Sequence, residues 1–245
     1  PRWVLLENQG HPGGGEGECE NETLVLERAP LSPVQPHHAI YVVFTPGSTG
    51  TLKGSVVTHR AFATSAMALS KAFKLSNCSR VFQFSSYACD VSIADTLVTL
   101  ISGGCICVPS STQRQNDIPG AVRELRANWA HLTPSVARLF SPDQIPSVRT
   151  LVLSGEPMSA ADVSAWAEQV TLINAYGQAA CSVDCCVRSP VQLQTSAADI
   201  GFATGCTLWV VDPNDYERLL PIGAPGELVV EGPVVGREYL HDAAA

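Results

Sequence analysis

A segment rich in glycine, serine and threonine carries the residue types best suited to binding a phosphate. It reads TPGSTGTLKG from Thr45 to Gly54 and follows an apolar run, YVVF. Glycine lets the backbone approach a ligand closely, Lys53 supplies a point charge, and successive backbone N–H groups in such a loop form an anion-binding concavity. The spacing does not match the GxxxxGK[ST] loop of NTPases, because Gly54 follows Lys53. On composition alone, the segment is either a phosphate-binding loop or an ordinary turn.

The elements that must position this loop alternate along the chain. Strands separated by helices of about ten residues are typical of βαβ units and a parallel sheet. We expect strands at 39–44, 80–84, 104–108, 129–132, 149–153 and 170–174, and helices at 60–73, 91–102, 117–127, 134–140 and 159–168.

The two ends of the chain have a different texture. WVLL (3–6) predicts a short strand, followed by a Gly-rich acidic stretch and a Pro-rich linker. Beyond residue 200 there are short β-runs, TLWVVD (207–212) and GELVVEG (226–232), typical of an antiparallel or barrel-like segment. The sequence therefore predicts an α/β fold in three parts. These are a truncated, irregular N-terminal segment with a linker (1–38), an α/β core (39–200) and a small β-rich segment (201–245).

Charge and composition exclude several functions. The chain has 245 residues, 45% of them hydrophobic, and a net charge of −8. This acidity argues against nucleic acid or an anionic membrane as a partner, and the apolar stretches are too short to cross a bilayer. The nine cysteines form no CxxC pair and lie in apolar runs such as CICV (105–108) and DCCV (184–187). They indicate small buried thiols rather than a zinc site, and we expect a protein of the cytoplasm.

Five segments, in order along the chain, resemble the motifs of the adenylate-forming (AMP-binding) enzymes, and in particular the adenylation domains of nonribosomal peptide synthetases. They are the loop at 45–54, YACDVS (87–92), LSGEPMS (153–159), NAYG (174–177) and GELVVEG (226–232). HRAF (59–62), LTPSVARL (132–139) and WVVDPND (209–215) resemble the fungal synthetases of secondary metabolism. The resemblance covers residues 39–242 and implies the parallel-sheet large lobe of that superfamily.

The resemblance implies a ligase. The carboxylate of an amino acid would attack the α-phosphate of ATP, with Mg²⁺ as cofactor, to give an aminoacyl-adenylate and pyrophosphate. The aminoacyl group would then pass to the phosphopantetheine thiol of a partner carrier domain. The implied partners are the amino-acid substrate and the peptidyl carrier and condensation domains of a synthetase.

The resemblance also implies roles for individual residues. Lys53 and Thr49 would act in catalysis, and Asp90 would pair with the α-ammonium of the amino acid. The phosphates would be bound by Thr45, Gly47, Ser48, Thr49, Gly50 and Lys53. The nucleotide would be bound by Gly155, Glu156, Pro157, Asn174, Ala175, Tyr176 and Gly177. The substrate side chain would be surrounded by Val91, Ala94, His131, Val152, Ser154, Ala175, Val183 and Asp184.

Two of these assignments have alternatives. A buried carboxylate is costly unless it meets a cation, which suits substrate capture by Asp90, but Asp90 could instead cap the helix that follows it. His131 and Asp184 give the pocket a polar end, which favours a medium or large polar side chain. His131 could equally be a satisfied histidine at the end of a strand.

The chain departs from the family pattern in the loop, after NAYG and at its end. Pro46 replaces a usual Ser, which removes a hydroxyl and a backbone N–H, and Leu52 replaces a Pro. Gln178 and Ala180 stand where the family has Pro and a Mg²⁺-binding Glu, so no metal ligand is assigned and Mg²⁺ binding should be weakened. The chain also ends before the ribose-binding Asp, the hinge and the C-terminal lid with its catalytic Lys.

These departures leave three hypotheses. The chain is the central part of an amino-acid-activating ligase, impaired by itself. Alternatively, it is a catalytically degenerate adenylation domain that serves as a structural or docking module. The third possibility is a truncated gene product without a stable fold.

Overall fold

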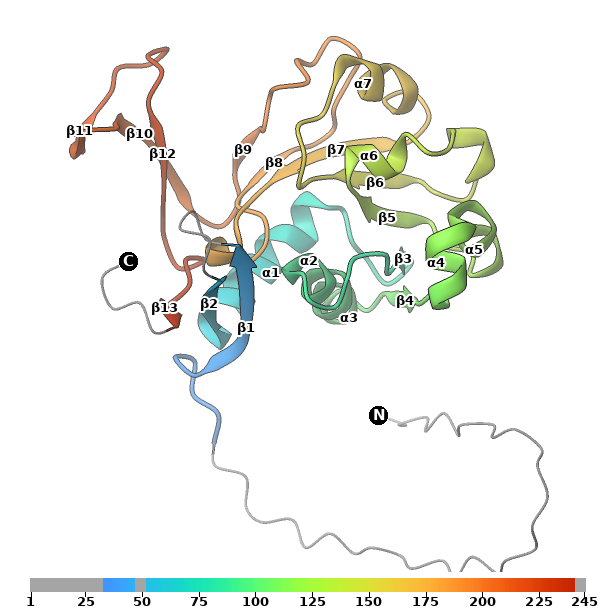
Figure 1. Ribbon diagram of the computed structural model, residues 1–245, viewed down its shortest axis with the longest axis horizontal. Coiled ribbons are helices and arrows are strands. Elements are labelled where there is room, and N and C mark those ends of the chain that lie inside the picture. Colours follow the sequence, from blue (N-terminus) through green and yellow to red (C-terminus); the bar gives the residue numbers. More distant parts are fainter. Residues whose placement is uncertain (1–32, 47–51, 241–245) are drawn as a thin grey trace, which may run out of the picture. The chain divides into compact units, whose positions relative to one another are not determined.

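The computed structural model describes residues 33–46 and 52–240 (Figure 1). The chain divides into a unit of residues 1–34 and a unit of residues 35–245, and nearly all described residues belong to the second. The strand expected at 3–6 and the loop residues Gly47, Ser48, Thr49 and Gly50 lie outside the described residues.

A seven-stranded sheet forms the centre of the second unit, in the order β4-β3-β5-β6-β7-β8-β9. Its parallel strands are β4 (Cys105–Cys107), β3 (Arg80–Phe82), β5 (Trp129–Leu132), β6 (Thr150–Leu153) and β7 (Thr171–Tyr176). The expected parallel sheet is therefore confirmed. β8 (Cys186–Arg188) and β9 (Phe202–Ala203) extend it in antiparallel fashion and were not expected from the sequence, because runs this short carry no periodicity.

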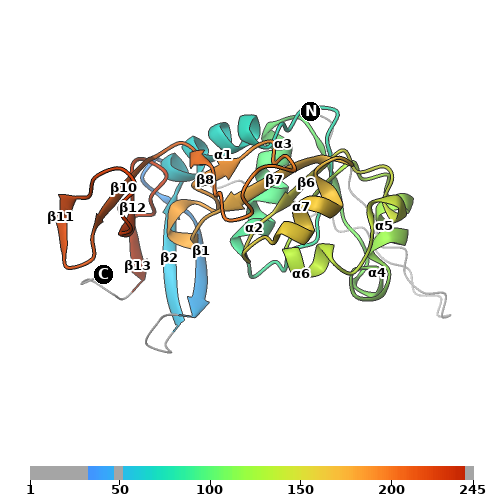
Figure 2. The same ribbon diagram turned by 90° about the horizontal axis from the view of Figure 1, so that it is seen from above.

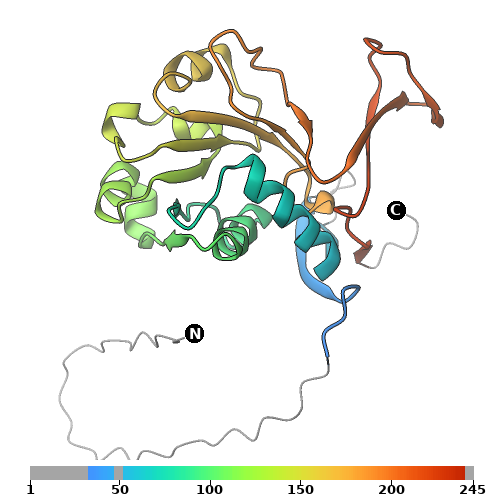
Figure 3. The ribbon, with the colours of Figure 1, turned by 180° about the vertical axis from the view of Figure 1, so that it is seen from behind.

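Alternate residues of these strands pack on opposite faces of the sheet, as strand geometry requires. On one face, Ala130 and Leu132 pack with α5 (Ile118–Glu124), α6 (Pro134–Ala137) and α7 (Ala160–Trp166). On the other face, Trp129, Val152, Ile173 and Ala175 pack with α1 (His59–Ala72) and with the helical segment 90–101. Figure 3 shows α1 and this segment together on their side of the sheet. The second face carries the candidate pocket residues.

The helical segment contains α2 (Asp90–Ile93), a π-helical stretch (Ala94–Val98) and α3 (Thr99–Ile101). The remaining helices are α4 (Ser111–Asn116) and 3₁₀ turns at Pro142–Gln144 and Ala179–Cys181. Side chains cap several helices: Thr58 accepts a hydrogen bond from the Ala61 N–H (3.2 Å) and Ser159 from the Asp162 N–H (3.3 Å).

Two small antiparallel sheets complete the described chain. In the first, β2 (Leu52–Thr58) pairs with both β1 (Ala39–Pro46) and β13 (Glu238–Leu240), which lie beside it in Figure 2. The expected strand at 39–44 is thus present, but it forms a hairpin with β2 instead of joining the parallel sheet. The second contains β10 (Thr207–Asp212), β11 (Asp215–Leu219) and β12 (Glu227–Glu231), which confirms the β-rich C-terminal segment.

Eight cysteines fall within the described residues, and all are free thiols. Cys107, Cys181, Cys185 and Cys186 are buried as expected, but Cys105 is exposed because it begins the edge strand β4. In the same part of the chain, no helix has the length and apolar character needed to span a membrane.

Candidate functional site

The β1–β2 hairpin presents the phosphate-loop segment. At the end of the hairpin from which the loop emerges, Thr45 lies opposite Lys53 and Pro46 lies opposite Leu52. The Nζ atom of Lys53 lies 5.6 Å from the centre of the Tyr239 ring, a distance suited to a cation–π contact. The described ends of the loop therefore hold Lys53 next to the point where the loop leaves the sheet.

The carboxyl ends of β5, β6 and β7 gather four predicted pocket residues. The strands run parallel, with His131 opposite Val152 and Leu153 opposite Asn174, so His131, Val152, Ser154 and Ala175 come to one edge of the sheet. His131 Nε2 and Ser154 Oγ share a hydrogen bond of 2.6 Å. All four are buried.

The start of α2 places a carboxylate against this edge. Asp90 is the first residue of α2 and Cys89 is its N-cap, so the alternative that Asp90 caps the helix is wrong. Asp90 is 9% exposed and accepts a weak hydrogen bond from Cys89 Sγ at 3.4 Å. Burial raises its pKa above 3.8. Val91 and Ala94 on the same segment pack against the cluster that contains Val152 and Ala175.

The loop after β7 completes the pocket side of the site. Gly177 has no room for a side chain, because a Cβ atom there would lie 1.8 Å from the Val183 carbonyl oxygen. Ser182 and Val183 have φ values of 56° and 85°, which a β-branched residue rarely adopts. Such strain persists only where the surroundings impose it, and here it fixes Val183 and the buried Asp184 beside the end of β7.

Three hydrogen bonds pin this strained loop. Ser65 Oγ on α1 donates to the Ser182 carbonyl (2.8 Å), and Ser182 Oγ donates to the Val234 carbonyl (2.6 Å). The Gly236 N–H donates to the Ala180 carbonyl (2.6 Å). The loop is therefore held both from α1 and from the chain just before β13.

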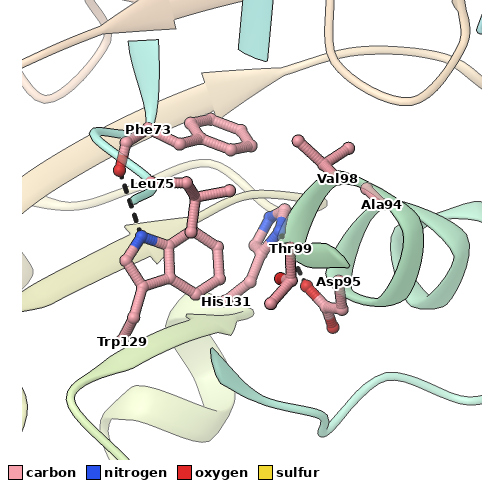
Figure 4. Close-up of a pocket in the computed structure, with 8 residues that line it drawn as sticks. All are labelled: Phe73, Leu75, Ala94, Asp95, Val98, Thr99, Trp129 and His131. Carbon is pink, nitrogen blue, oxygen red and sulfur yellow. Dashed lines mark hydrogen bonds and ion pairs between the residues drawn. The ribbon is translucent and has the colours of Figure 1, made fainter. Parts of the chain in front are cut away.

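Asp95 is a further buried carboxylate that the sequence interpretation missed. Its Oδ1 lies 3.8 Å from His131 Nδ1, beyond hydrogen-bond distance, and neither of its oxygens has a hydrogen-bond partner among the described residues (Figure 4). Burial raises the pKa of Asp95 well above its usual range and lowers that of His131 to about 4. His131 is therefore neutral near pH 7, and the contact is not an ion pair.

Asp184 shares this environment. It is 3% exposed, and its Oδ2 has no partner within the described residues. Burial, followed by the negative charge of Asp90, raises its pKa to about 8. The charge of Asp184 in turn raises the pKa of Asp95, so the three carboxyl groups are close enough to interact.

The predicted nucleotide-binding residues lie at the same edge of the sheet. Gly155, with φ +78°, makes the turn after β6, followed by Glu156 and Pro157. Glu156 accepts hydrogen bonds from the Ser135 N–H (3.0 Å) and Oγ (2.5 Å), which lower its pKa. Asn174 near the end of β7 donates through Nδ2 to the Asp199 carbonyl at 2.9 Å, and Tyr176 packs against the buried cysteines.

The position of the expected Mg²⁺ ligand does not fit the metal. Ala180 lies in the 3₁₀ turn after Gln178 and carries no oxygen in its side chain, whereas Mg²⁺ requires oxygen ligands. Within residues 33–46 and 52–240, no group of three His, Cys, Asp or Glu side chains is arranged to hold a metal ion.

Comparison with known proteins agrees with this architecture. Residues 5–240 match the family model described as "AMP-binding enzyme". Over 212 residues the chain is 50% identical to nonribosomal peptide synthetase rstn8 of Penicillium ochrochloron, covering 86% of this chain and 11% of the relative. It is 47% identical over 207 residues to D-lysergyl-peptide-synthetase subunit 2 of Epichloe festucae var. lolii, covering 84% and 15%. The chain thus spans a small part of these relatives.

A solved structure shows the same fold. The Vibrio cholerae adenylation domain AlmE, crystallised with glycyl-adenosine-5'-phosphate, superposes with a TM-score of 0.75 at 24% identity, over 85% of this chain and 42% of that one. The parallel sheet with its flanking antiparallel sheets is accordingly the fold of adenylation domains. The chain belongs to the AMP-binding enzyme family, as an adenylation domain of the kind found in fungal nonribosomal peptide synthetases.

Proposed function

We propose that this domain activates an amino acid as its aminoacyl-adenylate. The observation that carries the proposal is the buried Asp90 carboxylate, whose charge acts on the buried Asp184 beside the carboxyl edge of the sheet at the end of β7. In open α/β sheets, ligands bind at this edge. A substrate α-ammonium would supply the cation that Asp90 lacks, and its carboxylate would then be positioned to attack a phosphate held near Lys53.

The chemical step is a displacement at phosphorus. A carboxylate oxygen forms a bond to the α-phosphate of ATP while the bond to the bridging oxygen breaks, and pyrophosphate leaves. Thr49 and Lys53 stabilise the charge on the transferring phosphate, with Thr45, Gly47, Ser48 and Gly50 supporting them. Gly155, Glu156, Pro157, Asn174, Ala175, Tyr176 and Gly177 form the nucleotide side. Val91, Ala94, His131, Val152, Ser154, Val183 and Asp184 surround the substrate side chain.

The partners follow from the relatives. Both relatives are named as peptide synthetases. We therefore propose that the aminoacyl group passes to phosphopantetheine on a peptidyl carrier domain, beside a condensation domain. The division into 1–38, 39–200 and 201–245 remains part of the proposal. The free thiols support a location in the reducing cytoplasm.

Amino-acid-dependent exchange between ATP and labelled pyrophosphate tests this function in the full-length protein. We expect exchange with at least one amino acid and its loss in Asp90→Ala. Absence of exchange with every standard and common non-standard amino acid would contradict the ligase function.

A degenerate domain with a structural or docking role is the second candidate, and Ala180 favours it because the side chain offers no oxygen to Mg²⁺. The double variant Pro46→Ser, Ala180→Glu separates the two. A degenerate domain would show ATP–pyrophosphate exchange only after these two residues are restored. Normal exchange by the unaltered protein would exclude the degenerate domain. A cooperative thermal transition of the expressed chain would exclude the third possibility, an unstable truncated product.

A further inference from the structure

The candidate pocket holds more buried carboxyl groups than one substrate ammonium can pair with. Asp90, Asp95 and Asp184 are 9%, 2% and 3% exposed, and Asp184 interacts electrostatically with each of the other two. The ion pairs formed by Arg138, Arg188, Arg218 and Arg237 do not involve these three carboxyl groups. Among the described residues, the basic side chain that faces Asp95 is His131, which is neutral near pH 7.

Asp95 and Asp184 differ in what surrounds them. Asp95 faces His131 across a narrow cavity lined by Phe73, Trp129 and Val98, with no space that a water molecule could enter (Figure 4). Asp184 instead lies on the loop against Gly177, next to the end of β7, and its charge interacts with that of Asp90. Asp184 is therefore the carboxylate best placed to meet a ligand that Asp90 also binds.

The conformation of the loop supports a binding role for Asp184. Ser182 and Val183 are held at positive φ by hydrogen bonds from α1 and to the chain before β13. This arrangement forces Asp184 into the interior, although a carboxylate would be better solvated outside. Oδ2 of Asp184 is left without a partner inside the described chain, as expected for a group whose partner arrives with a ligand.

We propose that the pocket takes an amino acid with a cationic side chain, an ammonium or guanidinium group that pairs with Asp184 while the α-ammonium pairs with Asp90. The proposal rests on the proposed function and narrows the substrate to basic amino acids. Ala94, Ser154 and Ala175, which line the candidate pocket, carry small side chains that would crowd the aliphatic stem of such a substrate less than larger residues. The raised pKa of Asp184 agrees with a site from which a cation is missing.

Matched pairs of amino acids test the proposal in pyrophosphate exchange with the full-length protein. Ornithine and arginine are compared with their uncharged isosteres, norleucine and citrulline. We expect at least one cationic substrate to exceed its isostere about 100-fold in kcat/KM, because leaving a buried charge unpaired is costly. Asp184→Asn should abolish this preference, mainly by loss of activity with the cation, and Asp184→Ala should do the same.

Asp143→Asn is the matched control, since Asp143 is an exposed aspartate in a 3₁₀ turn, and it should leave the preference unchanged. Circular dichroism melts establish that each variant is folded. Preference of the unaltered protein for a neutral amino acid, or a preference that survives both Asp184 variants, overturns the inference while the ligase function stands.

Equilibrium dialysis with labelled ornithine and arginine distinguishes a failure of the proposed cation pocket from a failure of the proposed ligase function. Binding of either that depends on Asp184, without exchange, supports the cation pocket and contradicts the ligase function. Absence of both binding and exchange overturns the two together.

Discussion

The buried carboxyl of Asp184 makes the stability of this fold depend on pH in a calculable way. Its pKa is raised from 3.8 to about 8, mainly by burial, so the folded state binds a proton that the unfolded chain has released above pH 4. The stability associated with this proton is complete below the unfolded pKa and is lost progressively as pH rises to the folded pKa. Asp184→Asn removes the titration, because the amide is neutral in both states.

The magnitude follows from the shift. Each tenfold change in a protonation equilibrium is worth about 1.4 kcal/mol. Between pH 5.5 and 8.5 the aspartate should therefore cost the unaltered chain on the order of 3 kcal/mol of stability that the asparagine variant keeps. Asp184 is 3% exposed, so solvent screens this effect little.

Urea unfolding of both proteins at a series of pH values measures the effect. The difference in unfolding free energy, variant minus unaltered protein, should grow steadily from pH 5.5 to about 8 and then level off. Asp143→Asn, on the exposed 3₁₀ turn, should show no such growth. A difference that stays constant over this range, or shrinks, would refute the claim that Asp184 is buried without a cation.

Three further outcomes are expected. Ornithine or arginine binding should release protons near pH 7, measurable by calorimetry in buffers of different ionisation enthalpy, because the cation favours ionised Asp184; uptake would contradict this. Gly177→Ala should lower stability by about 2 kcal/mol or more in urea unfolding, since its Cβ would meet the Val183 carbonyl oxygen at 1.8 Å. Arg138 holds the pKa of Asp162 down to about 2, a contribution present above pH 4 and lost as pH falls to 2. The loss of thermal stability in Arg138→Ala should accordingly be seen at pH 6 and disappear towards pH 2.

The parallel core was predictable because its strands are short apolar runs bounded by turn residues. The strand expected at 129–132 is β5, and the run at 207–212 is β10. The first antiparallel sheet was not predictable, since β2 pairs with β13 nearly 200 residues later and such partnership leaves no local pattern. LKGSVVT (52–58) also overlaps the phosphate-loop motif, so its first residues were interpreted as part of a loop and not as a strand.

The candidate pocket was likewise only partly predictable from the sequence. The motifs located Asp90, His131 and Asp184, but they gave no indication of Asp95. In a regular α-helix a residue five positions after Asp90 points about 140° away from it. The π-helical stretch that begins at Ala94 changes this relation and keeps Asp95 on the buried side with Ala94 and Val98. The widened turn is visible only in the folded structure.

The hydrogen bonds that pin the strained loop also constrain how this domain can be recombined with its relatives. Ser182 forms hydrogen bonds with Ser65, which precedes it in the sequence, and with Val234, which follows it. Ala180 forms a hydrogen bond with Gly236. A chimera that exchanges only residues 90–190 would separate the loop from both of its anchors. To transplant a substrate preference intact, the exchanged block must extend from α1 through residue 236.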